Sequence, residues 1–174
     1  TEDFAISIAT KAQEEIEVQE SLKNRHLVRL KFWEQFINAS NQVNQLFSNN
    51  SPSKESWIGK GIGMSGVNIN LAMSNNYCRS EIIFNRGSQE ENKELYDFIY
   101  QMKDKIENDF GGQLTWERMD DKVTCRVKAQ LDGVSYFEES DWKKMNEFLI
   151  DVSVRMERAF KEPIRKLNNY WKNK

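Results

Sequence analysis

The sequence predicts an α+β fold, in which a mostly antiparallel five-stranded sheet is packed by amphipathic helices. Two observations indicate the elements: apolar residues recur at helical spacing in some segments and alternate with polar residues in others. A third indicates the pairing, because the segments between neighbouring strands are short enough for hairpins, which join antiparallel strands. The expected order is helix, helix, three strands, helix, two strands and helix, with the helices on the apolar face of the sheet.

The N-terminal part predicts two helices of different character. Residues 3–24 carry a thin apolar stripe, which is typical of a connecting or docking helix. Residues 25–47 carry a wider stripe, and a loop of turn-forming residues follows it. We therefore expect an N-terminal connecting helix over residues 1–24 and a single α+β domain over residues 25–174.

Five segments have the composition or the alternation of strands: 56–63, 67–74, 77–85, 114–119 and 123–131. The alternation is clearest in the second and the fifth of them. Asn75-Asn76 separates the second strand from the third, and asparagine tolerates the positive φ of a two-residue hairpin turn.

Two further helices complete the expected order. Residues 88–110 have helical apolar spacing, Ser88 can cap the first turn, and Gly111-Gly112 can end the helix. A last long helix begins near Ser140. Pro163 should kink or restart this helix, because proline lacks the N–H group that the helix needs.

The composition excludes several kinds of site. The 174 residues include one His and two Cys, which is too few for a four-ligand zinc site of N and S donors, and a Ser-His-Asp system would need His26. The 25 basic and 27 acidic side chains nearly balance, which argues against capture of nucleic acid by the charge of the whole chain. No apolar stretch could span a membrane.

Two widely separated cysteines fit a reducing compartment, so we expect a cytoplasmic protein. We also expect no cofactor and no metal site. The first residue is not Met, so we expect either that Met was removed or that the chain is a fragment of a longer protein.

Residues 61–66 spell G-x-G-x-x-G. In a dinucleotide-binding fold this motif lies between a strand and a helix, whereas here an alternating strand follows it. We therefore interpret the motif as a tight turn that requires glycine, with a small anion-binding nest of backbone amides as the alternative.

Polar side chains gather on one side of the predicted strands and are the candidate binding residues. Basic side chains beside aromatic ones could bind phosphates or stacked bases. The alternative is the ordinary solvent-exposed face of an antiparallel sheet. No residue is a catalytic candidate. The binding candidates are Asn68, Asn70, Arg79, Arg126 and Lys128, with Lys60 and Arg86 at strand ends and Trp57 nearby.

The order of elements parallels the core of the PD-(D/E)XK nucleases. Those enzymes need an acid on the second strand and Glu-x-Lys on the third, because carboxylates hold Mg²⁺ and the lysine helps to position water. Here the second strand offers Asn68 and Asn70, and Glu81 on the third is followed two residues later by Ile83. A divergent metal-dependent nuclease that uses Glu81 is the enzymatic alternative.

Three stretches, followed by a strand at 122–130 and Trp142, together resemble a known family. They are residues 29–36 (RLKFWEQF), 57–66 (WIGKGIGMSG) and 103–116 (KDKIENDFGGQLTW). In this order they are similar, over about residues 25–168, to an uncharacterised bacterial and archaeal family labelled only as a domain of unknown function.

The resemblance implies a context rather than a mechanism. Members of that family often carry the domain at the C-terminus, after a half that resembles PD-(D/E)XK endonucleases. The resemblance implies no catalytic residues for this sequence. We therefore expect a non-catalytic accessory module for nucleic-acid contact or protein association, with a nuclease-like domain or nucleic acid as partner. A structural dimerisation module, in which residues 1–24 join two copies as a homodimer, is the third alternative.

Overall fold

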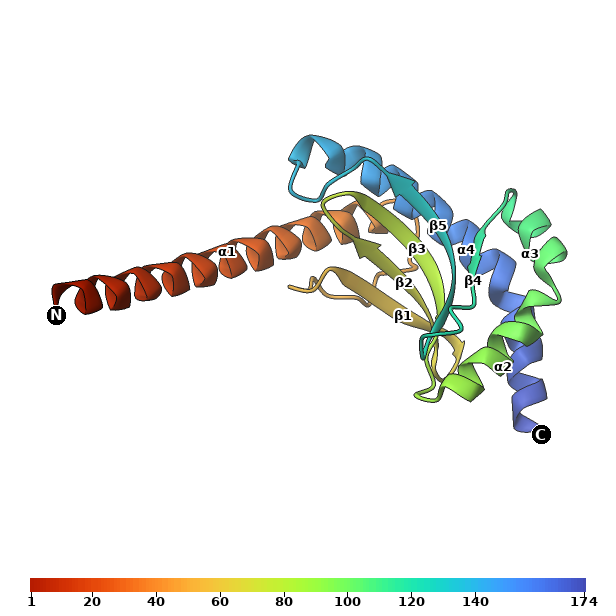
Figure 1. Ribbon diagram of the computed structural model, residues 1–174. Helices are drawn as coiled ribbons and strands as arrows, with labels where there is room; N and C mark the ends of the chain where they lie inside the picture. Colours follow the sequence, from red (N-terminus) through yellow and green to blue (C-terminus); the bar gives the residue numbers. More distant parts are fainter.

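The computed structural model describes residues 1–174, and it confirms the α+β class. Four α-helices accompany one five-stranded antiparallel sheet of strand order β1-β2-β3-β5-β4 (Figure 1). The elements are α1 (Glu2–Asn41), β1 (Trp57–Met64), β2 (Val67–Met73), β3 (Tyr77–Phe84), α2 (Gln89–Tyr100), α3 (Lys103–Phe110), β4 (Thr115–Glu117), β5 (Cys125–Asp132), the 3-10 turn η1 (Glu139–Asp141) and α4 (Trp142–Lys172).

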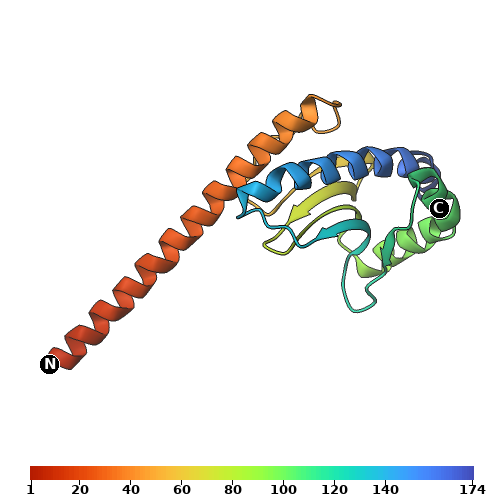
Figure 2. The same ribbon diagram turned by 90° about the horizontal axis from the view of Figure 1, so that it is seen from above.

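The two helices expected at the N-terminus form one continuous helix, α1. No glycine or proline lies near residue 24, so nothing interrupts the backbone hydrogen bonds there. Figures 1 and 2 show that the N-terminal part of α1 projects away from the sheet. No side chain before Phe32 is fully buried. The division of the chain into residues 1–24 and 25–174 stays a proposal.

The apolar face of the sheet is covered by helices in two places. Phe32, Trp33 and Phe36 of α1 are fully buried against β1–β3 and the first half of α4. The side chains of α2 and α3 and the second half of α4 bury the other end, around Phe84 and Val127. Burial of each large apolar side chain contributes about 1.5–3 kcal/mol. Figure 2 shows α4 running along one side of the sheet, so this helix joins both parts of the core.

The helix expected over residues 88–110 is divided into α2 and α3. Its predicted ends are confirmed: the Ser88 hydroxyl accepts a hydrogen bond from the Glu91 N–H, and Gly111 is left-handed with φ 88°. The break falls at Met102, where the N–H donates to the Ile99 carbonyl three residues back. The two helices therefore run in different directions (Figure 1), and side chains of both reach the core.

Pro163 lies inside α4 and does not end it. Its side chain is buried, and Figure 1 shows that the axis of α4 turns in its C-terminal part, as expected for a helix that contains proline. Of the two predicted outcomes, a kink and a restart, the structure shows the kink in a continuous helix.

A buried lysine holds the segment between β4 and β5. The Lys93 Nζ atom donates to the carbonyls of Arg118 at 2.6 Å, Met119 at 2.7 Å and Thr124 at 3.0 Å. An ammonium has three donors and no acceptor, so these carbonyls match its hydrogen-bonding capacity. The neighbouring Asn92 side chain donates to the Val123 carbonyl at 2.9 Å. The first turn of α2 therefore positions the whole β4–β5 connection.

Replacement of Lys93 by Met should lower the free energy of unfolding by about 3 kcal/mol, because it leaves three buried carbonyls without their charged donor. Urea denaturation measures the change. Lys122→Met is the matched control, since Lys122 is exposed in the same connection, and it should change stability by less than about 0.5 kcal/mol. Equal losses in the two variants would contradict the assigned role of Lys93.

Candidate functional site

Strand register brings candidate polar side chains together on the face opposite the helices. Successive side chains of a strand point to opposite faces. Asn70 on β2, Glu81 on β3 and Lys128 on β5 lie in one row across the sheet. Neighbouring rows supply the rest of what we call the polar face, which consists of Trp57, Asn68, Asn70, Arg79, Glu81, Glu117, Arg126, Lys128 and Gln130.

Two carboxylates organise the three basic side chains of the polar face. The Glu81 Oε2 atom lies 3.0 Å from Arg79 Nε and 3.3 Å from Arg126 Nη1, and the Glu81 side chain is only 5% exposed. The Glu117 Oε1 atom lies 3.3 Å from Arg126 Nε and 3.2 Å from Lys128 Nζ. A buried carboxylate is costly unless it is paired, so Glu81 requires its two arginine partners. The same two contacts hold both guanidinium groups in place. The network of three cations and two anions keeps one positive charge.

Several polar atoms of this face are buried without a hydrogen-bond partner in the chain. The side-chain oxygens of Asn70 and Gln130 are two of them. The Nε atoms of Arg79 and Arg126 are within ion-pair distance of carboxylates, but their N–H groups are not aligned for a hydrogen bond. An unsatisfied buried group costs about 1–3 kcal/mol.

Gly59 on β1 makes room for Asn70. A Cβ atom at Gly59 would lie 2.0 Å from Asn70 Oδ1, so the amide rests directly over the glycine. Gly61 differs, because a Cβ atom there would lie 3.9 Å from Asn68 Oδ1, which is ordinary contact. The absence of a side chain at Gly59 is therefore a requirement for the observed position of Asn70.

The G-x-G-x-x-G motif lies in the β1–β2 hairpin, as its interpretation as a tight turn predicts. Gly63 has φ 103° at a bulge in the pairing of the two strands, and Gly66 has φ 82° in the turn itself. A Cβ atom at Gly66 would also lie 2.5 Å from the Arg86 side chain. Both glycines therefore have conformational roles.

Two of the candidate binding residues lie away from the polar face. Lys60 lies on the helix side of β1, in a surface hollow that it lines with Arg158 and Lys161 of α4. Arg86 donates from Nη1 to the Ser65 carbonyl at 2.7 Å, and its guanidinium lies 5.1 Å from the centre of the Trp171 ring. Arg86 thus stabilises the β1–β2 turn and the end of α4.

The other aromatic and polar candidates remain on the polar face. Trp57 is 50% exposed at the edge strand and Asn68 is exposed. Trp116 instead points into the core, where its Nε1 atom donates to Glu107 Oε2 at 3.2 Å.

Sequence reasoning missed Glu117 and Gln130. Gln130 continues the alternation of Arg126 and Lys128, so the pattern along β5 could have identified it. Glu117 reaches its partners only through the pairing of β4 with β5, and three residues of strand give too little pattern to fix that register.

Cys78 and Cys125 are buried free thiols on the apolar face of the sheet. Burial raises the pKa of Cys78 to about 12. Burial also raises the pKa of Cys125, against the opposing effect of the Lys93 ammonium. Thiolates are therefore scarce at neutral pH, which makes both thiols poor nucleophiles. No group of three or more His, Cys, Asp or Glu side chains is placed to share a metal ion.

Comparison with known protein families matches residues 28–164 to the family described as Domain of unknown function (DUF4268). The chain belongs to the DUF4268 family. No curated protein and no solved structure matches the chain. No helix is long and apolar enough to cross a membrane.

Every residue of the polar face lies inside the DUF4268 match, whereas most of the projecting part of α1 precedes it. The sheet, the helices that cover it and the Lys93 contacts therefore belong to the family domain. The first 27 residues lie outside the match.

Replacement of Gly59 by Ala in this DUF4268 domain should destabilise it by about 1–2 kcal/mol, because Asn70 must move away from the new methyl group. Chemical denaturation measures the loss. Gly61→Ala is the control and should cost less. Asn70→Ala should recover part of the loss when it is combined with Gly59→Ala, since contacting residues are not additive. Additive losses would show that Asn70 is not the cause.

Proposed function

We propose that the domain is a non-catalytic accessory module that contacts single-stranded nucleic acid through the polar face. The observation that carries the proposal is the convergence of Arg79, Arg126 and Lys128, which are held by only two carboxylates on a sheet face without a covering helix. The resemblance to domains that follow a nuclease-like half supports the accessory role.

The ion pairs prepare the arginines for contact with phosphate. A guanidinium has five N–H donors in a fixed plane, so pairing with Glu81 through one edge leaves other donors for a second anion. Because Glu81 fixes the orientation of two guanidinium groups, little side-chain entropy is lost on binding. The single net positive charge implies modest affinity and a clear dependence on salt.

Trp57 and the exposed amide of Asn68 favour a single strand. Trp57 is exposed at the edge of the sheet, where an unstacked base could lie against its ring. Asn68 is exposed on the same face, and its amide could exchange hydrogen bonds with a base or a sugar hydroxyl. In a duplex the bases remain stacked, so neither contact would form.

The alternative of a divergent nuclease gains no support from the position of Glu81. Its carboxylate lies between two arginines rather than beside other acids. Nearby cations neutralise a carboxylate that would otherwise attract Mg²⁺. We therefore do not extend the proposal to catalysis.

The double change Arg79→Glu/Lys128→Glu should abolish a salt-sensitive mobility shift of a single-stranded oligonucleotide, because it reverses two of the three positive charges. Lys143→Glu/Lys144→Glu makes the same change of charge at exposed positions at the start of α4 and should keep the shift. Thermal unfolding tests whether each variant is folded, since Arg79→Glu places a second carboxylate beside Glu81. The proposal fails if the parent protein gives no shift at low salt, or if both variants lose it equally.

Trp57→Ala should weaken binding of the same oligonucleotide by roughly tenfold, since one stacked base contributes about 1–3 kcal/mol. Fluorescence anisotropy with a labelled strand measures the dissociation constant. The salt dependence should be unchanged, because no phosphate contact is removed. An unchanged affinity would remove Trp57 from the proposed site.

A further inference from the structure

The projecting part of α1 carries apolar side chains that no other part of the chain covers. Ile16 is 51% exposed, Leu27 57% and Leu30 36%. A solitary helix of this kind is only marginally stable in water, because most helical stability in proteins comes from packing of an apolar face. A partner that covers these apolar side chains would therefore stabilise the segment.

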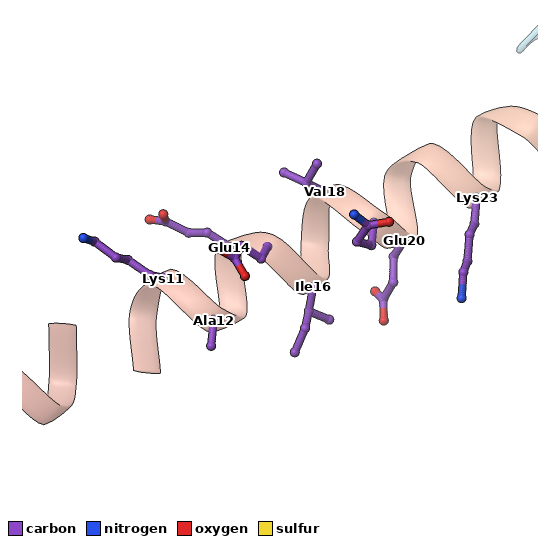
Figure 3. Close-up of a pocket in the computed structure, with 9 residues that line it drawn as sticks. Lys11, Ala12, Glu14, Ile16, Val18, Glu20 and Lys23 are labelled. Atoms are coloured by element: carbon purple, nitrogen blue, oxygen red, sulfur yellow. The ribbon is translucent and has the colours of Figure 1, made fainter. Parts of the chain in front are cut away.

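Five of the exposed residues form a single seam along the helix. Ile16, Glu20, Lys23, Leu27 and Leu30 follow one another at intervals of four, three, four and three residues, which is the spacing of a coiled-coil contact. We call these five residues the α1 seam. Figure 3 shows that Ile16, Glu20 and Lys23 point to the same side of the helix, together with Ala12, whereas Val18 points to the other side.

The α1 seam faces away from the domain to which the helix is attached. The side of α1 that meets the domain carries Arg29, whose Nε atom donates to the Tyr136 hydroxyl at 3.3 Å, and the buried Trp33 and Phe36. Leu27 and Leu30 lie on the exposed side. The seam is therefore free for another chain along its whole length.

Charge along α1 selects the partner and its direction. Residues 2–20 contain six acidic side chains and one basic one, whereas residues 23–31 contain four basic side chains and no acidic one. Within the α1 seam, Glu20 and Lys23 have opposite charges and stand next to each other. Two parallel copies would place like charges together at both positions, which is destabilising.

We propose that the α1 seam pairs antiparallel with the α1 seam of a second copy of this chain. A two-fold axis between Glu20 and Lys23 brings each Glu20 against Lys23 of the partner subunit, so the pair forms twice. The same register places Ile16 against Leu27 of the partner subunit and Ala12 near Leu30 of the partner subunit. Apolar contacts thus flank a charged centre that fixes direction and register.

The overlap in this register runs from about residue 12 to residue 31 of each copy, which is roughly 30 Å of helix. The acidic stretch of one copy then lies along the basic stretch of the other. The polar face takes no part in this contact, so the proposal is independent of nucleic-acid binding.

Sedimentation equilibrium over a concentration series tests the proposal. The parent protein should form a dimer, and Glu20→Lys or Lys23→Glu should each shift the population to monomer, because each creates two like-charge contacts. The double variant Glu20→Lys/Lys23→Glu should restore the dimer, since the exchanged charges again face each other. Circular dichroism establishes that the domain is folded in each variant.

Glu14→Lys is the matched control. It makes the same change of charge as Glu20→Lys but lies on the other side of the helix in Figure 3, so it should leave the dimer intact. A parent protein that stays monomeric overturns the proposal and leaves the α1 seam to a different partner. A dimer that survives the single reversals, or a double variant that stays monomeric, overturns the antiparallel register.

Discussion

The buried ammonium of Lys93 is the contact on which the attachment of β4, and with it the Glu117 end of the polar face, depends. It binds the carbonyls of Arg118 and Met119, the two residues that directly follow Glu117 in the chain. The Met119 sulfur in turn lies 3.4 Å from Arg126 Nη2. One side chain of α2, on the apolar side of the sheet, thereby sets where Glu117 and Arg126 meet on the opposite side. Arg118 strengthens the same attachment through two contacts with Asp97, at 2.9 and 3.0 Å.

The sheet shows how one alternating pattern serves two purposes. The side chains on one face of the sheet are apolar and pack against α1–α4. Their burial provides most of the stability. The side chains on the opposite face do not pack against helices and can be polar. They are long, and the neighbouring arginines cover Glu81 so that it is nearly buried. Stability and recognition therefore reside largely on opposite faces of the same strands. A substitution at Lys128, whose partner Glu117 is partly exposed, can alter binding with little effect on the core.

Much of this architecture is predictable from sequence because alternation and helical spacing are local properties. The fold class, the hairpins, the Ser88 cap and the shared face of Asn70, Arg79, Arg126 and Lys128 follow from them. Lys60 was misplaced because Gly59 and Gly61 conceal the alternation of β1, although Ile58 and Ile62 mark its true side. The Glu117 contacts and the break at Met102 depend on tertiary packing, which no local pattern encodes. The sequence predicted two helices in place of α1 because the apolar content changes near residue 24. The helical backbone continues through this point without a break.

The continuity of α1 has a mechanical consequence. The helix is clamped at Phe32, Trp33 and Phe36 and contains no glycine or proline before them, so it acts as a stiff lever whenever its exposed part is helical. About 30 residues extend beyond the clamp, which corresponds to roughly 45 Å. A tilt of about 10° at the aromatic clamp would move the far end by roughly 8 Å. Small changes in packing between α1 and α4 would therefore cause a larger displacement of the N-terminal end of α1. A partner bound there would move with the packing of the core.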